Sequence, residues 1–336
     1  MVGTLTRSRI VAFAGYAPST VRTNADLEKF VDTSDEWIVQ RTGIRERHVV
    51  EQGEATSDLA AIAGARALDK SGLSPDEIDL VIVGTCTPDH PLPSTASIVC
   101  ERLEIPTAGS FDVSAACASY GYVLAQGHAA VTSGLARNAL VIGADVMSGL
   151  MDWSDRTTCV LFGDGAGSAV VTSRAGLGAD GVLAVDSGTL PDLNSLVVPS
   201  GGSRSPLGRN DGLDVDPYLR MNGREVFKFA SKTIVDSVER LLAKGGVGAE
   251  DVDLFVPHQA NLRIVEHAVN KTGIPMERVM TNLDRYGNTS SGSIPLALAE
   301  ADDQGRLEPG SLVLTIGFGG GLTWAGLLFR YGGATA

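Results

Sequence analysis

Cys117 lies in the segment SAACASYG, residues 114–121, where one thiol stands among small side chains. The segment follows a short strand-like run at 109–113 and opens a helix-like run. A free cysteine is usually a buried core residue, so the segment alone fits either a space-filling side chain or a nucleophile. The positive end of a helix dipole stabilises a thiolate. We therefore expect a lowered pKa for Cys117 and a thiol able to attack a carbonyl group.

Two more polar side chains occupy comparable places in the second half of the chain. His258 ends an apolar run in FVPHQANLRI, and Asn288 lies in DRYGNTSSGS, just before the helix-like SIPLALAEADD. A lone histidine is usually structural, and an asparagine after glycine is usually a turn residue. A thiol, an imidazole and an amide that all stand beside helix starts predict one site for nucleophilic catalysis.

The positions of these residues are related by an internal repeat. Residues 68–83 resemble residues 242–257 at an offset of 174, and the same offset aligns LVIG at 140–143 with LTIG at 314–317. We interpret this as a duplication, although helix–turn–strand units resemble one another in many proteins. Under the offset, Cys117 corresponds to Ser291, three residues beyond Asn288. The two halves would then bring equivalent helix starts to one place.

The elements that must position these side chains alternate between helices and short buried strands. Helices are expected at 57–72 and 225–246, each followed by an apolar strand, and two more strands at 138–144 and 310–318. This alternation predicts an α/β fold with mostly parallel sheets, whose ligands bind at the carboxyl ends of the strands. We expect residues 1–178 to form the half with the nucleophile and 179–336 the half with His258 and Asn288. A surface loop around 187–216 would join them.

Composition excludes several classes of function. The net charge of −13 includes no basic stripe, which argues against nucleic-acid binding. The four cysteines form no CxxC pair, and the five histidines lack metal-ligand spacing, so we expect a reduced, cytoplasmic protein without a metal. No apolar run reaches the ~18–20 residues of a membrane span. The first apolar run, of about five residues, is shorter than the core of a signal peptide.

Seven longer motifs occur in order along the chain: DTSDEWIVQRTGIRER (32–47), DVSAAC (112–117), FGDGAG (162–167), MNGREVFKFA (221–230), VPHQANLRI (256–264), YGNTSSGSIPLAL (286–298) and GFGGGLTWAG (317–326). Together they resemble β-ketoacyl-acyl-carrier-protein synthase III, of the thiolase superfamily, over essentially the whole chain. The resemblance implies two duplicated thiolase-like halves with layered mixed sheets and buried central helices. It also implies condensation of an acyl-CoA, expected to be acetyl-CoA, with malonyl-acyl carrier protein. No cofactor is implied, because the acyl-CoA is a substrate.

The resemblance also implies residue roles. Cys117 matches the nucleophile that accepts the acyl group, and His258 and Asn288 match the pair that binds the malonyl thioester carbonyl. The backbone N–H groups of Cys117 and Gly320 match the oxyanion hole. The residues implied to bind CoA or substrate are Trp37 and Arg41, Arg156, Asn261, Phe318 and Leu92, with Leu92 reaching across a homodimer interface into the partner's acyl pocket. Carrier-protein docking is expected at Arg263, Lys228 and Lys271, with Lys232 and Arg278 as further candidates.

Two residues depart from the family pattern. The family usually reads CAGF after the nucleophile, whereas this chain has Ser119 and Tyr120 in CASY. We expect Ser119 to add bulk near the site and the buried hydroxyl of Tyr120 to need a partner, with an effect on acyl-chain preference. Three alternatives stay open: a cysteine hydrolase, a starter-unit condensing enzyme of polyketide metabolism, and a non-catalytic partner subunit.

Overall fold

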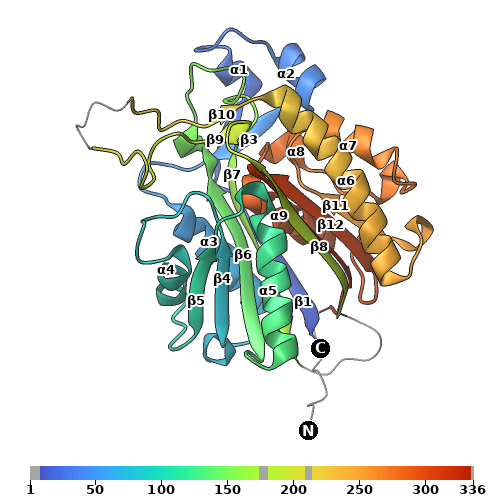
Figure 1. Cartoon of the computed structure of the whole chain (residues 1–336). Coiled ribbons are helices and arrows are strands. Elements are labelled where there is room, and N and C mark those ends of the chain that lie inside the picture. The colour runs from blue at the N-terminus through green and yellow to red at the C-terminus, as the bar shows by residue number, and fades with distance from the viewer. Residues whose placement is uncertain (1–7, 174–180, 209–213, 334–336) are drawn as a thin grey trace.

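The computed structural model describes residues 8–173, 181–208 and 214–333. The first half builds a sheet in the order β1-β7-β6-β4-β5, and the second half a sheet in the order β11-β12-β13-β8 (Figure 1). The first sheet consists of β1 (Arg9–Tyr16), β4 (Leu80–Gly84), β5 (Gly109–Val113), β6 (Asn138–Val146) and β7 (Asp164–Thr172). The second consists of β8 (Gly181–Asp192), β11 (Leu254–Pro257), β12 (Leu312–Gly319) and β13 (Gly321–Arg330). Small ribbons pair β2 (Thr20–Thr23) with β3 (Glu46–Val49) and β9 (Leu196–Val197) with β10 (Arg220–Met221).

Both main sheets are mixed. β4 runs parallel to β5 and β6, and β11 runs parallel to β12, whereas β1, β7, β13 and β8 pair antiparallel with their neighbours. The expectation of mostly parallel sheets is therefore wrong, and the layered mixed sheets implied by the family resemblance are observed. Parallel pairing is confined to the strands joined through helices, because the others follow tight turns or long connections.

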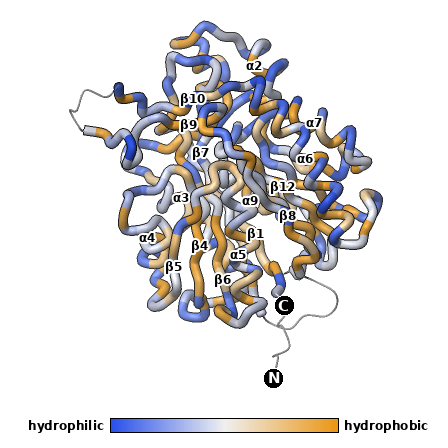
Figure 2. The backbone as a smooth tube through the Cα atoms, viewed as in Figure 1, coloured by the Kyte–Doolittle hydropathy of each residue, from blue (hydrophilic) through white to orange (hydrophobic). Residues whose placement is uncertain are grey.

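The helices form three layers around the two sheets. Their bounds are α1 (Asn24–Leu27), α2 (Asp35–Thr42), α3 (Thr56–Ser71), α4 (Thr95–Arg102), α5 (Ser119–Ser133), α6 (Gly223–Gly245), α7 (Leu262–Val269), α8 (Leu283–Tyr286) and α9 (Ser293–Asp303). Helices α5 and α9 lie between the sheets and share one core with both. Helices α3 and α4 pack on the outer face of the first sheet, and α6 and α7 on that of the second. Figure 2 shows hydrophobic residues along the central strands and hydrophilic ones on outer helices such as α7.

The repeat offset of 174 holds in three dimensions. Single 3-10 turns η1 (Pro75–Glu77) and η4 (Ala249–Asp251) precede β4 and β11, and η2 (Ala116–Ala118) and η6 (Ser290–Gly292) precede α5 and α9. Gly72 and Gly246 end their helices with the same left-handed φ of 67°. The Asp79 N–H donates to the carbonyl of Asn138, as Asp253 does to Leu312. Equivalent hydrogen bonds at equivalent positions support the duplication.

The predicted boundary between residues 178 and 179 lies outside the described residues. The loop expected at 187–216 is wrong at its start, because residues up to Asp192 belong to β8 and pair with β13. Two further 3-10 turns are η3 (Met147–Leu150) and η5 (Met276–Arg278). Within the described ranges, no helix combines the length and the apolar character needed to cross a bilayer.

Candidate active site

Cys117 lies in the η2 turn between β5 and α5, and not in the first turn of the α-helix itself. The turn is tight, because Ala116 adopts a left-handed φ of 48°, which non-glycine residues rarely adopt. The thiol is buried, and the Ser290 hydroxyl of the equivalent turn η6 donates to its sulfur over 3.4 Å. Ser290 has a left-handed φ of 51° at the position that matches Ala116. The two strained turns therefore meet at Cys117.

His258 follows β11 and is held on two sides. Its Nδ1 lies 2.6 Å from the Ser293 Oγ at the start of α9, and the Phe318 ring packs edge-on against the imidazole with the centroids 5.0 Å apart. The ring is almost fully buried, and desolvation lowers the pKa of His258 to about 3. The imidazole is therefore neutral at physiological pH.

The amide of Asn288 has a defined orientation. Its Oδ1 accepts from the backbone N–H of Ser290 over 2.9 Å, so the amide NH₂ is the group that remains to donate to a ligand. Backbone hydrogen bonds join Asn288 to Leu161 and Gly163, which lie just before β7 in the first half of the chain. The loop that carries Asn288 is thus attached to the half that carries Cys117.

Two cavities meet at Cys117. One, of about 120 Å³, is lined by Cys117, His258, Asn288 and Phe318, and extends along Asn261 and Phe227. The other, of about 330 Å³, is lined by Cys117, Cys86 and apolar side chains that include Met147, Leu150, Phe162 and Leu219. Cys117, Phe162 and Leu196 line both. The three residues named from the sequence for nucleophilic catalysis therefore do share one cavity.

The expected lowering of the Cys117 pKa is wrong. Burial raises the pKa of the thiol to about 12; the Ser290 hydrogen bond opposes this rise, and the carboxylate of Asp145 adds to it. Desolvation disfavours the thiolate more than a single hydroxyl and the end of a helix can stabilise it. The sulfur is therefore protonated at rest and loses its proton only as it reacts.

Sequence reasoning missed three residues that support the site. Ser290 contacts Cys117, and Ser293 contacts His258. The buried carboxylate of Asp145 accepts hydrogen bonds from Ser291 and from the segment Thr85–Thr87, which contains Cys86. The repeat offset could have identified the two serines, because it places Ser290 opposite Ala116 and Ser293 opposite Ser119. Asp145 had no such signal, since an aspartate at the end of a strand is common.

The residues expected to bind CoA gather around one indole ring. The guanidinium carbons of Arg41 and Arg156 lie over the Trp37 ring at 4.7 and 5.2 Å from its centroid. Arg156 also donates to the backbone carbonyl of Asp32 over 2.7 Å. Asn261 lines the smaller cavity, and its amide donates to the Arg41 carbonyl at the end of α2. Trp37, both arginines and Asn261 thus lie along one path toward Cys117.

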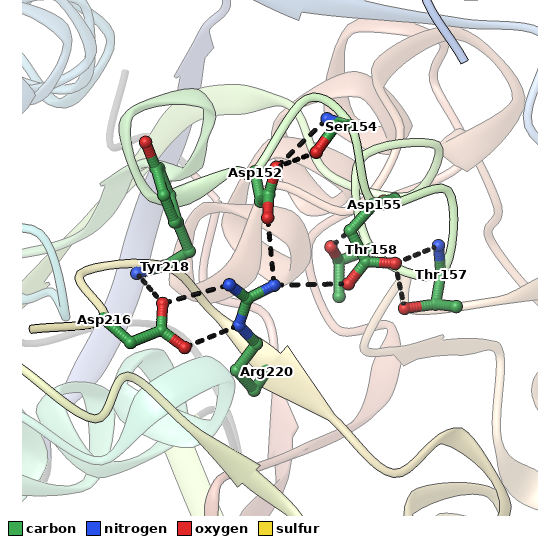
Figure 3. Close-up of polar contacts among 8 residues, drawn as sticks. All are labelled: Asp152, Ser154, Asp155, Thr157, Thr158, Asp216, Tyr218 and Arg220. Carbon is green, nitrogen blue, oxygen red and sulfur yellow. Dashed lines mark hydrogen bonds and ion pairs between the residues drawn. The ribbon is translucent and has the colours of Figure 1, made fainter. Parts of the chain in front are cut away.

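The loop that carries Arg156 is held by a charged network centred on Arg220 in β10. Arg220 contacts Asp216 through two hydrogen bonds, of 2.7 and 3.1 Å, and lies 3.1 Å from Asp152 and 3.6 Å from Asp155 (Figure 3). Asp152 and Asp155 also accept from the backbone and hydroxyl groups of Ser154 and Thr157. The network joins both flanks of Arg156 to the segment that leads into α6.

The remaining predicted residues divide between Gly320, which lines a cavity, and side chains on the surface. Gly320, in the turn after β12, lines the larger cavity, and the neighbouring Gly319 leaves no room for a side chain: an added Cβ would lie 2.6 Å from the Cys117 nitrogen. Leu92 is 82% exposed and contributes to neither cavity of its own chain. Lys228, Arg263 and Lys271 are exposed. Lys232 forms an ion pair with Asp236, and the Arg278 guanidinium donates to two backbone carbonyls, so both side chains already have partners within the chain.

The structure corrects the expectation for Ser119 and leaves Tyr120 without a partner. Ser119 is fully buried but lines neither cavity, so it adds no bulk to them. Tyr120 packs in the central core, and its hydroxyl has no hydrogen-bond partner among the described residues. Burial raises the pKa of Tyr120 well above its usual range.

A buried cysteine, a neutral imidazole and an oriented amide share one cavity in a layered, duplicated α/β fold, and this arrangement fits the class of condensing acyltransferases. Family models described as 3-oxoacyl-[acyl-carrier-protein (ACP)] synthase III match residues 111–191, and the C-terminal model of that family matches residues 242–331. The chain belongs to the 3-oxoacyl-[acyl-carrier-protein] synthase III family.

Individual relatives agree over nearly the full length. The β-ketoacyl-[acyl-carrier-protein] synthase III of Oleidesulfovibrio alaskensis is 45% identical over 97% of this chain and 99% of its own. The enzyme of that name from Clostridium perfringens is 46% identical over 96% and 99%. The crystal structure of the synthase from Aquifex aeolicus superposes with a TM-score of 0.88 at 43% identity, over 96% of this chain and 100% of that one. The priming β-ketosynthase from the R1128 polyketide pathway reaches 0.91 at 35% identity, over 99% and 98%.

Proposed function

We propose that this enzyme starts type II fatty-acid synthesis by condensing acetyl-CoA with malonyl-acyl carrier protein, giving 3-oxoacyl-acyl carrier protein, CO₂ and CoA. The observation that carries the proposal is the convergence of Cys117, His258 and Asn288 on one cavity in a member of this family. The adjoining apolar cavity offers space for the acyl chain on the other side of Cys117. The chemistry needs no metal or redox cofactor, because both substrates arrive as activated thioesters.

The first step transfers the acyl group to Cys117. The sulfur attacks the thioester carbonyl, the bond to the CoA sulfur breaks, and the thiol proton ends on the departing CoA. The backbone N–H groups of Cys117 and Gly320 donate to the oxygen that becomes negative in this step. Cysteine suits the step because a thiolate is both a strong nucleophile and a good leaving group for the next one.

The second step makes the new carbon–carbon bond. Loss of CO₂ from the malonyl group leaves an enolate, whose negative oxygen needs donors that are already in place. We propose that the Ser293 hydroxyl, 2.6 Å from His258 Nδ1, donates to that nitrogen, which places the ring proton on Nε2 as one donor; the amide NH₂ of Asn288 is the other. The enolate carbon then attacks the acyl carbonyl, and the Cys117 sulfur leaves and recovers a proton.

Substrate contacts follow from the path around Trp37. We propose that the CoA adenine binds against the Trp37 ring between the flanking guanidinium groups of Arg41 and Arg156, and that Asn261 and Phe318 line the pantetheine arm. Exposed Lys228, Arg263 and Lys271 supply positive charge for the acidic carrier protein on an otherwise acidic surface. All four cysteines are free thiols, which supports a cytoplasmic location.

A homodimer is part of this proposal. Strand β5 is one of the two edges of its sheet, and Phe111 on it is 42% exposed. Leu92, 82% exposed, lies three residues before Thr95, whose N–H donates to Asp112 on β5. A second copy that pairs with β5 would cover this edge and bring Leu92 to the acyl cavity of the partner.

The test separates the two half-reactions. Cys117→Ala should abolish acyl labelling of the protein by acetyl-CoA, measured by intact-protein mass spectrometry, together with condensation. Asn288→Ala should spare labelling of Cys117 and reduce malonyl decarboxylation at least a hundredfold. Labelling that persists in Cys117→Ala would disprove the nucleophile assignment. Release of free acid without condensed product would favour a hydrolase instead.

A second candidate is starter-unit condensation in polyketide metabolism, which the similarity to the R1128 priming ketosynthase supports. A panel of acetyl, branched and longer acyl-CoA primers with malonyl-carrier protein distinguishes the two. A kcat/KM that is highest for acetyl-CoA supports fatty-acid initiation. A clear preference for a longer or unusual primer supports the polyketide reading.

A further inference from the structure

Ser119 is the first residue of α5, two positions after the nucleophile, and its hydroxyl makes two hydrogen bonds to the η2 turn. The backbone N–H of Ala115 donates to Ser119 Oγ over 2.8 Å, and Ser119 Oγ–H donates to the carbonyl of Ala116 over 2.7 Å. The side chain faces Gly84 in β4, where an added Cβ would lie 2.9 Å from Ser119 Cβ. Ser119 therefore holds the backbone of Ala115 and Ala116 in place without lining either cavity.

The carbonyl that Ser119 holds belongs to the same peptide unit as the Cys117 N–H. In a planar trans peptide the C=O and the N–H point in opposite directions. The Ser119 hydroxyl and the Ser119 backbone N–H both donate to the Ala116 oxygen, which sets the orientation of this plane. The Cys117 N–H is thereby directed to the opposite side, where the backbone of Gly319 approaches.

This peptide needs an external support. Ala116 has the left-handed φ of 48°, a sparsely populated region in which a non-glycine residue is strained. A strained turn persists only where its surroundings hold it, and the rotation that relieves the strain also turns the Cys117 N–H. The hydroxyl of Ser119 bonds to the turn on both sides of the strained residue.

The equivalent serine in the second half supports the comparison. Ser293 corresponds to Ser119 under the offset of 174 and likewise begins its helix. Its hydroxyl contacts the ring of His258 and not its own turn. Equivalent serines in the two halves thus contact different groups: Ser119 bonds to the backbone of the η2 turn, and Ser293 bonds to the His258 ring.

We propose that Ser119 is a positioning residue for acyl transfer, which holds the Ala116–Cys117 peptide so that the Cys117 N–H faces the thioester oxygen. It rests on the proposed function, because it requires an acyl-enzyme at Cys117. Its loss removes stabilisation from the transition state and leaves substrate binding intact. The Cys117 sulfur itself stays in place, since the remainder of η2 and α5 is unchanged.

The test compares a reaction that develops a carbonyl oxyanion with one that does not. Ser119→Ala removes the hydroxyl at nearly constant volume. We expect single-turnover acylation of Cys117 by acetyl-CoA to slow about 10- to 100-fold, a part of the ~10²–10³ found when an oxyanion donor is deleted outright. Alkylation of Cys117 by iodoacetamide, which passes through no oxyanion, should stay within about twofold. CoA affinity by calorimetry should be unchanged.

The matched control is Tyr120→Phe, which removes the adjacent buried hydroxyl that has no partner among the described residues. It should acylate at the wild-type rate. Equal acylation rates in Ser119→Ala and wild type would overturn the inference, as would an equal fall in acylation and alkylation, which means that the sulfur has moved. Ser119→Gly, which has no side chain and introduces the residue usual in the family, keeps the test decisive if the alanine variant does not fold, because it also lacks the hydroxyl. Failure of the wild-type protein to become acylated would instead refute the proposed function.

Discussion

The hydroxyl of Ser290 lies against the Cys117 sulfur, and this single contact affects the chemistry of the thiol. The hydroxyl donates to the Cys117 sulfur and so limits the rise in thiol pKa that burial causes. Ser290→Ala should raise that pKa further, because the thiolate loses its donor. We expect alkylation of Cys117 by iodoacetamide at pH 8 to slow several-fold, measured by mass spectrometry of the modified peptide.

Thr289→Val is the control for this change, because the neighbouring Thr289 hydroxyl is buried without a partner in the described chain. It should alkylate like the wild-type protein. Since the Cys117 pKa is about 12, the wild-type rate should also rise about tenfold per pH unit from pH 7 to 9 without levelling off. A plateau near pH 8 would contradict the raised pKa.

The buried imidazole of His258 makes stability depend on pH. Its pKa is about 3 in the folded protein against ~6.5 when unfolded, so the unfolded state binds more protons as the pH falls between these values. The contribution of the neutral His258 ring to the free energy of unfolding is fully present above about pH 6.5. It is lost progressively as the pH falls toward 3. Between pH 7 and pH 5 this one group should lower the free energy of unfolding by about 2 kcal/mol.

Urea unfolding at fixed protein concentration checks this value. His258→Gln has no titrating group at the position, so its loss of stability between pH 7 and pH 5 should be smaller than that of the wild type by about the same 2 kcal/mol. Identical pH dependence in the two proteins would show that His258 is not held neutral by burial.

At the element scale, the network around Arg220 links β10 to the loop that carries Arg156. Three aspartates surround the one guanidinium, and the local turns at Asp152 and Asp155 are part of the same network (Figure 3). Arg220→Gln should loosen both flanks of Arg156 and leave the buried catalytic groups unchanged. We expect KM for acetyl-CoA to rise about three- to tenfold with kcat nearly constant.

Arg137→Gln is the charge-matched control, because Arg137 is 80% exposed and pairs with Asp79 at a distance of 3.7 Å, on a different part of the fold. Exposed ion pairs are weakened by salt, so the difference between Arg220→Gln and wild type should shrink at 1 M NaCl. A fall in kcat with an unchanged KM would contradict a role in CoA binding.

At the scale of the whole molecule, the open edge at β5 calls for a partner. Leu92→Asp combined with Phe111→Asp places two charges on the exposed apolar groups near this edge. The double variant should convert a dimer to a monomer in analytical ultracentrifugation and lose most of its activity, because Leu92 would no longer reach the partner's cavity. Leu183→Asp, on β8 at the far side of the molecule, should remain dimeric (Figure 1). A wild-type protein that sediments as a monomer would refute the proposed dimer.

Much of the fold was predictable because it is encoded locally. Apolar periodicity identified α3, α6 and the strands β4, β6, β11 and β12, and the repeat offset placed equivalent turns before α5 and α9. The antiparallel pairs β1–β7 and β8–β13 were not predictable in the same way, because their strands lie more than a hundred residues apart in sequence. The pairing of distant strands depends on tertiary contacts that local sequence patterns do not encode.

The residue types of the site, the duplication that relates them and, through the motifs, the family could all be identified from the sequence. The contacts that support those residues depend on the folded arrangement of the two halves. The hydrogen bonds from Ser290 to Cys117 and from Ser291 to Asp145 join residues more than a hundred positions apart, and the pKa values follow from burial by the whole fold. Ser119 shows the difference most clearly: its identity was visible beside Cys117, but whether its hydroxyl faced the acyl group or the backbone depended on how closely β4 packs against α5.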